Sequence, residues 1–323
     1  MMKHYTVFGG HLSSELELPE LPAAEPAGAD WVLRVSNTLP PATSSREELG
    51  VASVDEGVAV RLFAVPGGYR LVYDDTGTFD VRGGGSEITW YPAPGASPAL
   101  AQLDVLGRVL ALAFHAAGIY CLHASAVALE GGAVGFIAPK FHGKSTTAYA
   151  LVHAGGRLIT DDTLPVLFGD PPLVRPGVQR VRLWGDSVSA VGANAAEGGE
   201  GMGKFVVDDL SAQQLLRGTA PLVALYLLAP VAANPGGEAV VRSRLSPVES
   251  ALALVGHAKI GALLGGSERQ VLFKRAVELA GVVPVYRLSI ARDFERLSEV
   301  AGQIAEWHGA GGGVRLELEA GAV

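Results

Sequence analysis

The stretch Ala138-Pro139-Lys140-Phe141-His142-Gly143-Lys144-Ser145 decides which fold to expect, because it nearly matches the phosphate-binding pattern G-x-x-x-x-G-K-[ST]. The apolar run at 133–137 before it is typical of a buried strand, and residues 145–154 after it are typical of a helix. Strand, loop and helix in this order are the context that the pattern requires. The sequence therefore predicts a loop whose backbone N–H groups converge on an anion at a helix N-terminus.

The loop has the residue types that a nucleotide such as ATP needs. The residues expected to contact the nucleotide are Phe141, His142, Gly143, Lys144, Ser145 and Thr146. Lys144 would reach the β and γ phosphates, and the hydroxyl of Ser145 would bind Mg²⁺, which prefers oxygen ligands. The side chains of Lys140 and His142 face either phosphate or solvent.

Two residues at the start of the loop depart from the pattern. Ala138 replaces the first glycine, which requires a negative φ there, and Pro139 has no N–H and fixes φ near roughly −65°. The remaining match could arise by chance in a chain rich in alanine and glycine. The flanking strand and helix favour a functional loop.

Two adjacent aspartates, Asp161 and Asp162, follow the next expected strand at 157–160. A crossover from the strand before the loop would bring the end of this strand beside the loop. Phosphate transfer to a hydroxyl needs one carboxylate at the metal and another that accepts the proton. Ser145 and Asp161 are the expected metal ligands, and which aspartate is the base stays open. Both can serve only if the backbone turns at Asp162, and the alternative is a pair that caps a turn.

Two further residues are candidates for the site. His123 lies in the strand-like run 119–129, where a core histidine hydrogen-bonded inside a sheet is the alternative. Lys204 directly follows a glycine-rich stretch at 192–203. That stretch would suit a loop over an acceptor, and Lys204 is placed to contact the nucleotide.

The composition excludes several classes of protein. Of 323 residues, 49% are hydrophobic and 18% charged, which is typical of a globular chain. The net charge of −8, without a dense Lys/Arg cluster, argues against a nucleic-acid partner. Cys121 is the single cysteine, which excludes an intramolecular disulfide framework and a cysteine-rich zinc site. The first residues lack the apolar region of a secretory signal, and the longest apolar runs are too short or too interrupted to span a bilayer. We expect a cytoplasmic protein with no membrane partner.

Three regions are expected along the chain. Residues 1–98 form a small, mostly β module, with the clearest strands at 31–35, 58–63 and 69–73. Residues 99–308 form the domain that contains the phosphate loop, with helices expected at about 98–117 and 247–264 among others. Residues 309–323 form a Gly-rich tail.

The segment from residue 119 to about 164 resembles the catalytic core of HPr serine kinase-type proteins, in which a histidine-bearing strand precedes a phosphate loop and two aspartates close the next strand. The matching residues are His123, Ser125, Gly143-Lys144-Ser145, residues 155–158 and Asp161-Asp162. The resemblance implies an α/β fold with a phosphoenolpyruvate-carboxykinase-like P-loop kinase core. It also implies ATP and Mg²⁺ as cofactors, and His123 lining the site.

The opening residues 5–10 and the element 18–21 resemble stand-alone HPr-kinase-like proteins found with peptide-tailoring pathways, including kinases of lasso-peptide precursors. That resemblance implies a serine of a ribosomal peptide as the acceptor. HPr itself is not expected, because the N-terminal module differs and the signature loop of the HPr regulators has no counterpart here. The alternatives are a kinase of a small-molecule hydroxyl and a nucleotide-binding switch without transfer activity. A homo-oligomer is compatible with the sequence.

Overall fold

The computed structural model describes residues 1–55, 57–197, 203–232 and 237–309. Contacts divide the described chain into two compact units: residues 1–123 with 254–276, and residues 124–197, 203–253 and 277–309. Residues 99–123 therefore group with the N-terminal sheet, whereas the sequence prediction begins the second domain at residue 99. Where the domains divide stays a prediction. The Gly-rich tail falls almost wholly outside the described residues.

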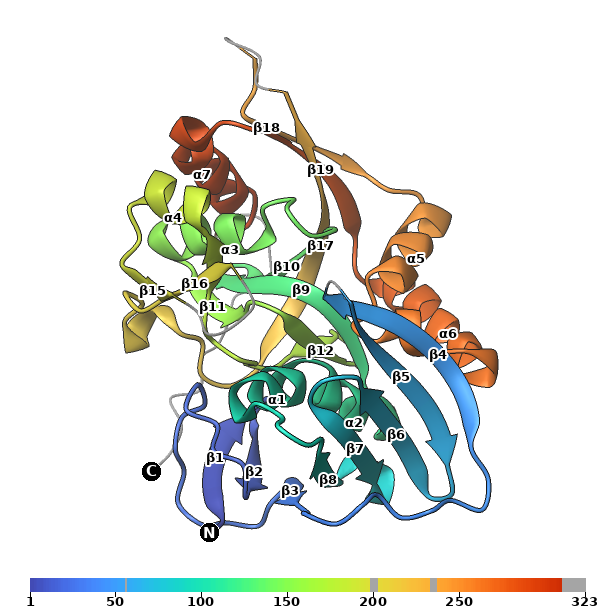
Figure 1. Ribbon diagram of the computed structural model, residues 1–323. Coiled ribbons are helices and arrows are strands. Elements are labelled where there is room, and N and C mark those ends of the chain that lie inside the picture. The colour runs from blue at the N-terminus through green and yellow to red at the C-terminus, as the bar shows by residue number, and fades with distance from the viewer. Residues whose placement is uncertain (56, 198–202, 233–236, 310–323) are drawn as a thin grey trace. The chain divides into compact units, whose positions relative to one another are not determined.

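The first unit is built on one eight-stranded sheet with the order β1-β2-β3-β8-β7-β6-β5-β4 (Figure 1). Its strands are β1 (Lys3–Val7), β2 (Gly10–Ser14), β3 (Trp31–Val35), β4 (Glu47–Asp55), β5 (Val58–Val65), β6 (Gly68–Tyr73), β7 (Gly77–Arg82) and β8 (Glu87–Pro92). The strands predicted at 31–35, 58–63 and 69–73 are confirmed, and β4 to β8 form an antiparallel meander joined by glycine-containing turns. Buried side chains largely alternate with partly buried ones in β5 and β6, which places one face of the sheet on a core.

The helix predicted at 98–117 is present as α1 (Pro98–Asp104), a π-helical turn η2 (Val105–Val109) and α2 (Leu110–Ala116). Its apolar face is buried, and Phe114 packs edge-on against Phe8 with ring centroids 4.8 Å apart. The sequence prediction held every apolar run too short or too interrupted to span a bilayer, whereas by length and composition alone this helical segment could cross one; half of the qualifying window is buried in the structure.

The second unit has a mixed sheet with the order β10-β9-β12-β13-β17-β19-β18, and β11 also pairs with β9. Its strands are β9 (Tyr120–Leu129), which begins in the first unit, β10 (Gly132–Ile137), β11 (Arg157–Thr160), β12 (Thr163–Leu167), β13 (Leu173–Val174), β17 (Ala220–Val231), β18 (Val240–Arg244) and β19 (Val285–Ala291). Both β10 and β11 run antiparallel to β9, so they point the same way with β9 between them. The helix α3 (Lys144–His153) connects them, which confirms the predicted crossover.

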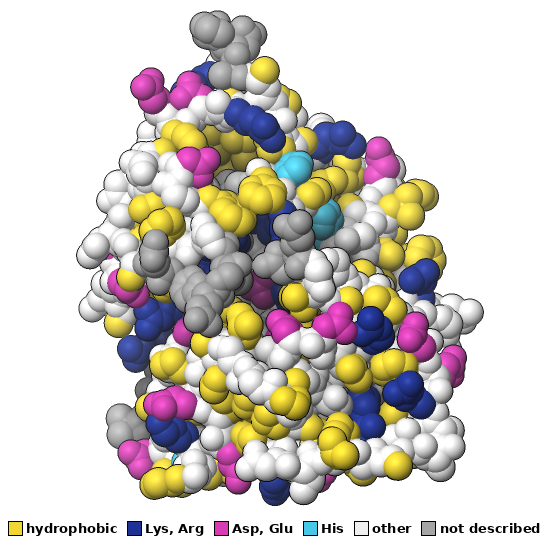
Figure 2. Space-filling model, viewed as in Figure 1, with side chains coloured by type: hydrophobic (Ala, Val, Ile, Leu, Met, Phe, Trp, Pro, Cys, Tyr) yellow, Lys and Arg dark blue, Asp and Glu magenta, His cyan; other side chains and the backbone are white. Residues whose placement is uncertain are grey.

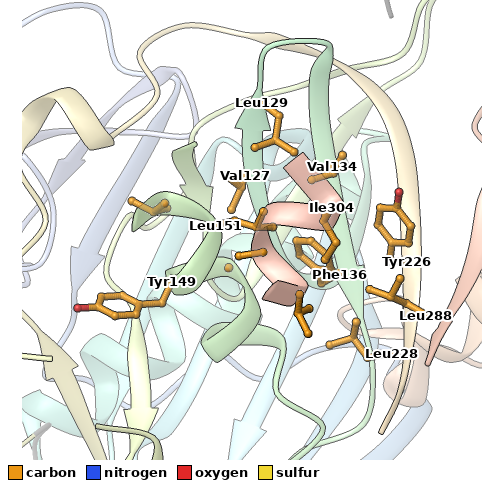
Figure 3. Packing of buried hydrophobic residues seen from close by; sticks show 14 of the residues in the cluster. Val127, Leu129, Val134, Phe136, Tyr149, Leu151, Tyr226, Leu228, Leu288 and Ile304 are labelled. Carbon is orange, nitrogen blue, oxygen red and sulfur yellow. The ribbon is translucent and has the colours of Figure 1, made fainter. Parts of the chain in front are cut away.

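A hydrophobic cluster fixes α3 on this sheet. Leu151 of α3, Phe136 of β10 and Ile304 of α7 (Leu297–Trp307) point into the same cluster and are fully buried (Figure 3). The helix α7 packs directly against α3 (Figure 1). Burying such side chains stabilises by about 1.5–3 kcal/mol each, so the start of α3 is held firmly at the end of β10.

A three-stranded sheet follows, with β16 (Lys204–Val207) between β14 (Arg182–Trp184) and β15 (Ala195–Glu197). The helix α4 (Gly185–Val191) connects β14 to β15. The glycine-rich stretch 192–203, expected to be a loop over the acceptor, thus contains a strand, and residues 198–202 of it lie outside the described part.

The helix predicted at 247–264 is too long. The helix α5 (Pro247–Gly256) ends where His257 accepts a hydrogen bond from the backbone N–H of His123 at 2.8 Å, and Lys259 donates its backbone N–H to Cys121. Apolar periodicity continues past residue 256, but pairing with β9 overrides it. The remaining helix is α6 (Gly266–Val282).

Candidate functional site

The predicted phosphate loop lies between the end of β10 at Ile137 and the start of α3 at Lys144. Gly143 caps the helix with φ 84°, a left-handed conformation that favours glycine, and its carbonyl accepts the backbone N–H of Thr147 at 2.8 Å. Ala138 is buried, and among the described non-glycine residues only Phe8 and Phe141 have positive φ. The condition for alanine at the first position of the loop, a negative φ, is therefore met.

Lys144 lies under the loop rather than in solvent. Its Nζ donates to the carbonyl oxygen of Ala138 at 2.7 Å and to that of Pro139 at 3.3 Å, and 9% of the residue is exposed. The ammonium group is thus held by two neutral carbonyls from the start of the loop. An anion in the loop would offer it a stronger, charge-assisted partner.

Asp161 lies at the centre of a buried polar cluster in the second unit. Its Oδ1 accepts the hydroxyl of Ser125 at 2.7 Å, and its Oδ2 accepts the backbone N–H of Arg182 at 2.9 Å. Burial raises the pKa of Asp161, and those two donors, the cation of Lys204 and the hydroxyl of Ser145 oppose that rise. The structure thus brings Asp161 beside Ser145.

Asp162 lies in a bend between β11 and β12, so the turn needed for both aspartates to serve is present. The residue is half-buried, and its carboxylate accepts the hydroxyl of Thr163 at 3.1 Å. Its backbone carbonyl accepts the N–H of Ala124 at 3.2 Å, which ties the bend to β9. If the two aspartates only capped a turn, the contact of Asp162 with Thr163 would be explained. The burial of Asp161 would not be explained.

His123 is half-buried in β9, two residues before Ser125. It belongs to the first unit, where its backbone N–H donates to His257. His123 also makes a further interaction, as a histidine hydrogen-bonded inside a sheet would.

Three other side chains of the loop have protein partners, whereas Lys140 is exposed. His142 donates from Nδ1 to the carbonyl of Lys140 at 2.8 Å, and Thr146 donates its hydroxyl to Ser187 at 3.3 Å. Phe141 is 69% exposed, and its ring stacks on Trp184 with centroids 4.7 Å apart and planes 25° apart. Sequence reasoning did not identify Trp184 and Ser187, because both lie far along the chain from the loop and contact it only in the folded structure.

Lys204 is close to the predicted site, as the sequence suggested. It pairs directly with Trp184 across β14 and β16, and its Nζ lies 5.3 Å from the centroid of the indole ring. It is also close enough to Asp161 to lower the pKa of that carboxyl. The cation of Lys204, in β16 of the small sheet, therefore lies near the carboxylate of Asp161.

Among the described residues, no group of three or more His, Cys, Asp or Glu side chains could hold a metal ion. On the face shown in Figure 2, lysine and arginine side chains are interspersed with acidic ones and do not gather into one patch.

Comparison with known proteins gives little. No family model matches the chain, and no curated protein matches it. Among solved structures the chain is similar to the HPr(Ser) kinase/phosphatase from Coxiella burnetii, with 11% identity and a TM-score of 0.29 over 58% of this chain and 86% of that chain. So low a TM-score does not establish a common fold.

Proposed function

We propose that this protein is a kinase that uses ATP and Mg²⁺ to phosphorylate a hydroxyl group. The observation that supports it most is that β10 and β11 run the same way, so the loop after β10 and Asp161 after β11 follow the same ends of these strands, and Ser145, next to Lys144, lies close enough to the buried Asp161 carboxylate to lower its pKa. Ligands of α/β proteins bind at such strand ends.

The residues present fit a magnesium–nucleotide complex. The hydroxyl of Ser145 and the carboxylate of Asp161 are oxygen donors, which Mg²⁺ prefers. A site with few protein ligands also suits Mg²⁺, which usually takes one or two carboxylates and completes its shell with phosphate oxygens and water. When bound, the ion would neutralise charge on the phosphates.

The chain's own residues would then divide the work. Lys144 would exchange the carbonyls of Ala138 and Pro139 for phosphate oxygens, and the loop N–H groups would hold the phosphates. Ser125 and the N–H of Arg182 would keep the Asp161 carboxylate oriented and ionised.

We assign the base to Asp162. Asp161 is 8% exposed and already accepts hydrogen bonds on both oxygens, whereas Asp162 is half-buried in the bend that follows it. Its carboxylate would accept the proton of the acceptor hydroxyl as the phosphate is transferred. His123 would line the site, as the family resemblance implies.

For the acceptor we propose a serine of a ribosomal peptide of the lasso type, because the N-terminal elements at 5–10 and 18–21 resemble kinases of such precursors. A small-molecule hydroxyl is the alternative acceptor for the same chemistry.

A second candidate function is a nucleotide-binding switch without transfer activity. The observation in its favour is that the Lys144 ammonium is bound to carbonyls of the altered loop start, Ala138 and Pro139. If Lys144 kept these carbonyl partners, the loop would bind a nucleotide through its other groups, and the lysine would not aid phosphate transfer.

Mass spectrometry of candidate acceptors separates these functions. Lasso-type precursor peptides and free hydroxyl metabolites are incubated with the protein, ATP and Mg²⁺. The expected result is one added phosphate on a peptide serine, lost in Lys144→Ala and Asp162→Asn and kept in Lys274→Ala, a matched change of an exposed lysine. Phosphate added to a metabolite and to no peptide would identify a small-molecule hydroxyl as the acceptor. ATP that is bound but stays intact with every acceptor would favour the nucleotide-binding switch.

A further inference from the structure

Phe141 has a backbone conformation that its side chain disfavours. Its φ is 66°, in the left-handed region where a bulky residue is an outlier that costs of order 1–3 kcal/mol. The same residue leaves 69% of its surface exposed, so burial of the ring does not compensate for the strain. Glycine at this position would avoid both the backbone strain and the exposure of an apolar ring. The presence of phenylalanine therefore indicates a use for the ring itself.

The ring of Phe141 is held in place by contacts within the second unit. Trp184 stacks against it at 4.7 Å, and Trp184 is in turn fixed in β14 opposite Lys204 of β16. The Lys204 ammonium lies 5.3 Å from the indole centroid, so Trp184 contacts both the ring of Phe141 and a cation. A stacked aromatic pair, of which Phe141 is largely exposed, thus lies at the phosphate loop.

We propose that the exposed ring of Phe141, backed by Trp184, is the stacking surface for the base of the bound nucleotide. The inference rests on the proposed function, since it assumes that the phosphates of a nucleotide occupy the loop. A planar heteroaromatic base is the part of a nucleoside triphosphate that gains most from an open aromatic face. Stacking accepts any base, so this surface supplies affinity for a nucleotide over inorganic phosphates.

Binding of ATP and of inorganic tripolyphosphate, each with Mg²⁺, tests the proposal, because the second ligand has the phosphates and no base. Titration calorimetry is run on the full chain and on Phe141→Gly, Phe141→Tyr and Trp184→Leu. Phe141→Gly removes the ring and also relieves the strain at φ 66°, so a loss of affinity cannot be attributed to added strain. Phe141→Tyr is the matched control that keeps an aromatic face.

The expected result is that Phe141→Gly weakens ATP binding by about 5- to 100-fold and leaves tripolyphosphate binding unchanged. Phe141→Tyr should bind both ligands as the natural protein does, and Trp184→Leu should show a smaller, ATP-selective loss. Thermal unfolding of each variant confirms that the fold persists.

Three outcomes would overturn the inference and leave the proposed function in place. Equal weakening of both ligands would mean that Phe141 only shapes the loop, and unchanged binding of both would mean that the ring has no part in nucleotide binding. Unchanged ATP affinity with a raised KM for the acceptor would assign the ring to the acceptor. Failure of the natural protein to bind either ligand would instead refute the proposed function, and the inference with it.

Discussion

Replacing Asp104 by asparagine should flatten the pH dependence of stability. Asp104, the last residue of α1, is 8% exposed and accepts the hydroxyl of Thr76 at 2.6 Å. Burial raises its pKa from 3.8 to about 7; Asp75 reinforces the rise, and Thr76, Arg108 and Tyr73 oppose it. The folded chain therefore holds a proton on this carboxyl where the unfolded chain has lost it.

The sign and size follow from that difference in pKa. The stability that the protonated Asp104 contributes is complete below pH 3.8 and is lost as the pH rises to about 7. The whole loss corresponds to about 4 kcal/mol, of which about 2.5 kcal/mol falls between pH 5 and pH 8. Asparagine has the shape of the neutral acid, can still accept from Thr76 and does not ionise.

Urea denaturation at pH 5 and at pH 8, followed by tryptophan fluorescence, measures the effect. Asp104→Asn should lose about 2.5 kcal/mol less than the natural protein between the two pH values. Glu87→Gln, which removes an exposed acid of the same unit, should behave like the natural protein. An equal pH dependence in the natural protein and in Asp104→Asn would refute the reasoning.

Three other changes have expected outcomes. Asp80→Asn should destabilise by about 3–5 kcal/mol in a denaturation assay, since it leaves buried Arg70 without the carboxylate that binds it at 2.6 and 2.8 Å; a loss under 1 kcal/mol would contradict this. Ser125→Ala should raise the pKa of Asp161 further, so the acid limb of the kcat–pH profile should move to higher pH, and an unmoved limb would count against a role for Asp161. Lys204→Gln should lower kcat about 10- to 100-fold with the fold intact; an unchanged kcat would exclude this cation from transfer.

Local chemistry accounts for what the sequence predicted well. The left-handed turn before α3 needs glycine at 143, and the negative φ at Ala138 followed from its side chain. The direction of the crossover brought Asp161 to the loop, because β10 and β11 must run the same way for their ends to meet. The roles of these residues in catalysis stay predictions.

Long-range pairing accounts for what the sequence did not predict. Phe141 and Trp184 lie far apart in the chain and meet only because of how the segment after β13 folds. The helix α5 ends at Gly256, where the chain turns to form backbone hydrogen bonds with His123 and Cys121 of β9. A local sequence pattern does not predict these long-range bonds. Periodicity reports which side chains are buried, and not against which distant strand they lie.

Titration calorimetry of ATP with Mg²⁺ against the natural protein, Lys144→Ala and Lys274→Ala tests the central claim most directly, namely that the loop at 138–146 is a nucleotide site. The account predicts that the natural protein and Lys274→Ala bind alike, whereas Lys144→Ala binds at least about tenfold more weakly because a buried charge-assisted contact to phosphate is lost. No binding by the natural protein, or unchanged binding by Lys144→Ala, would contradict it.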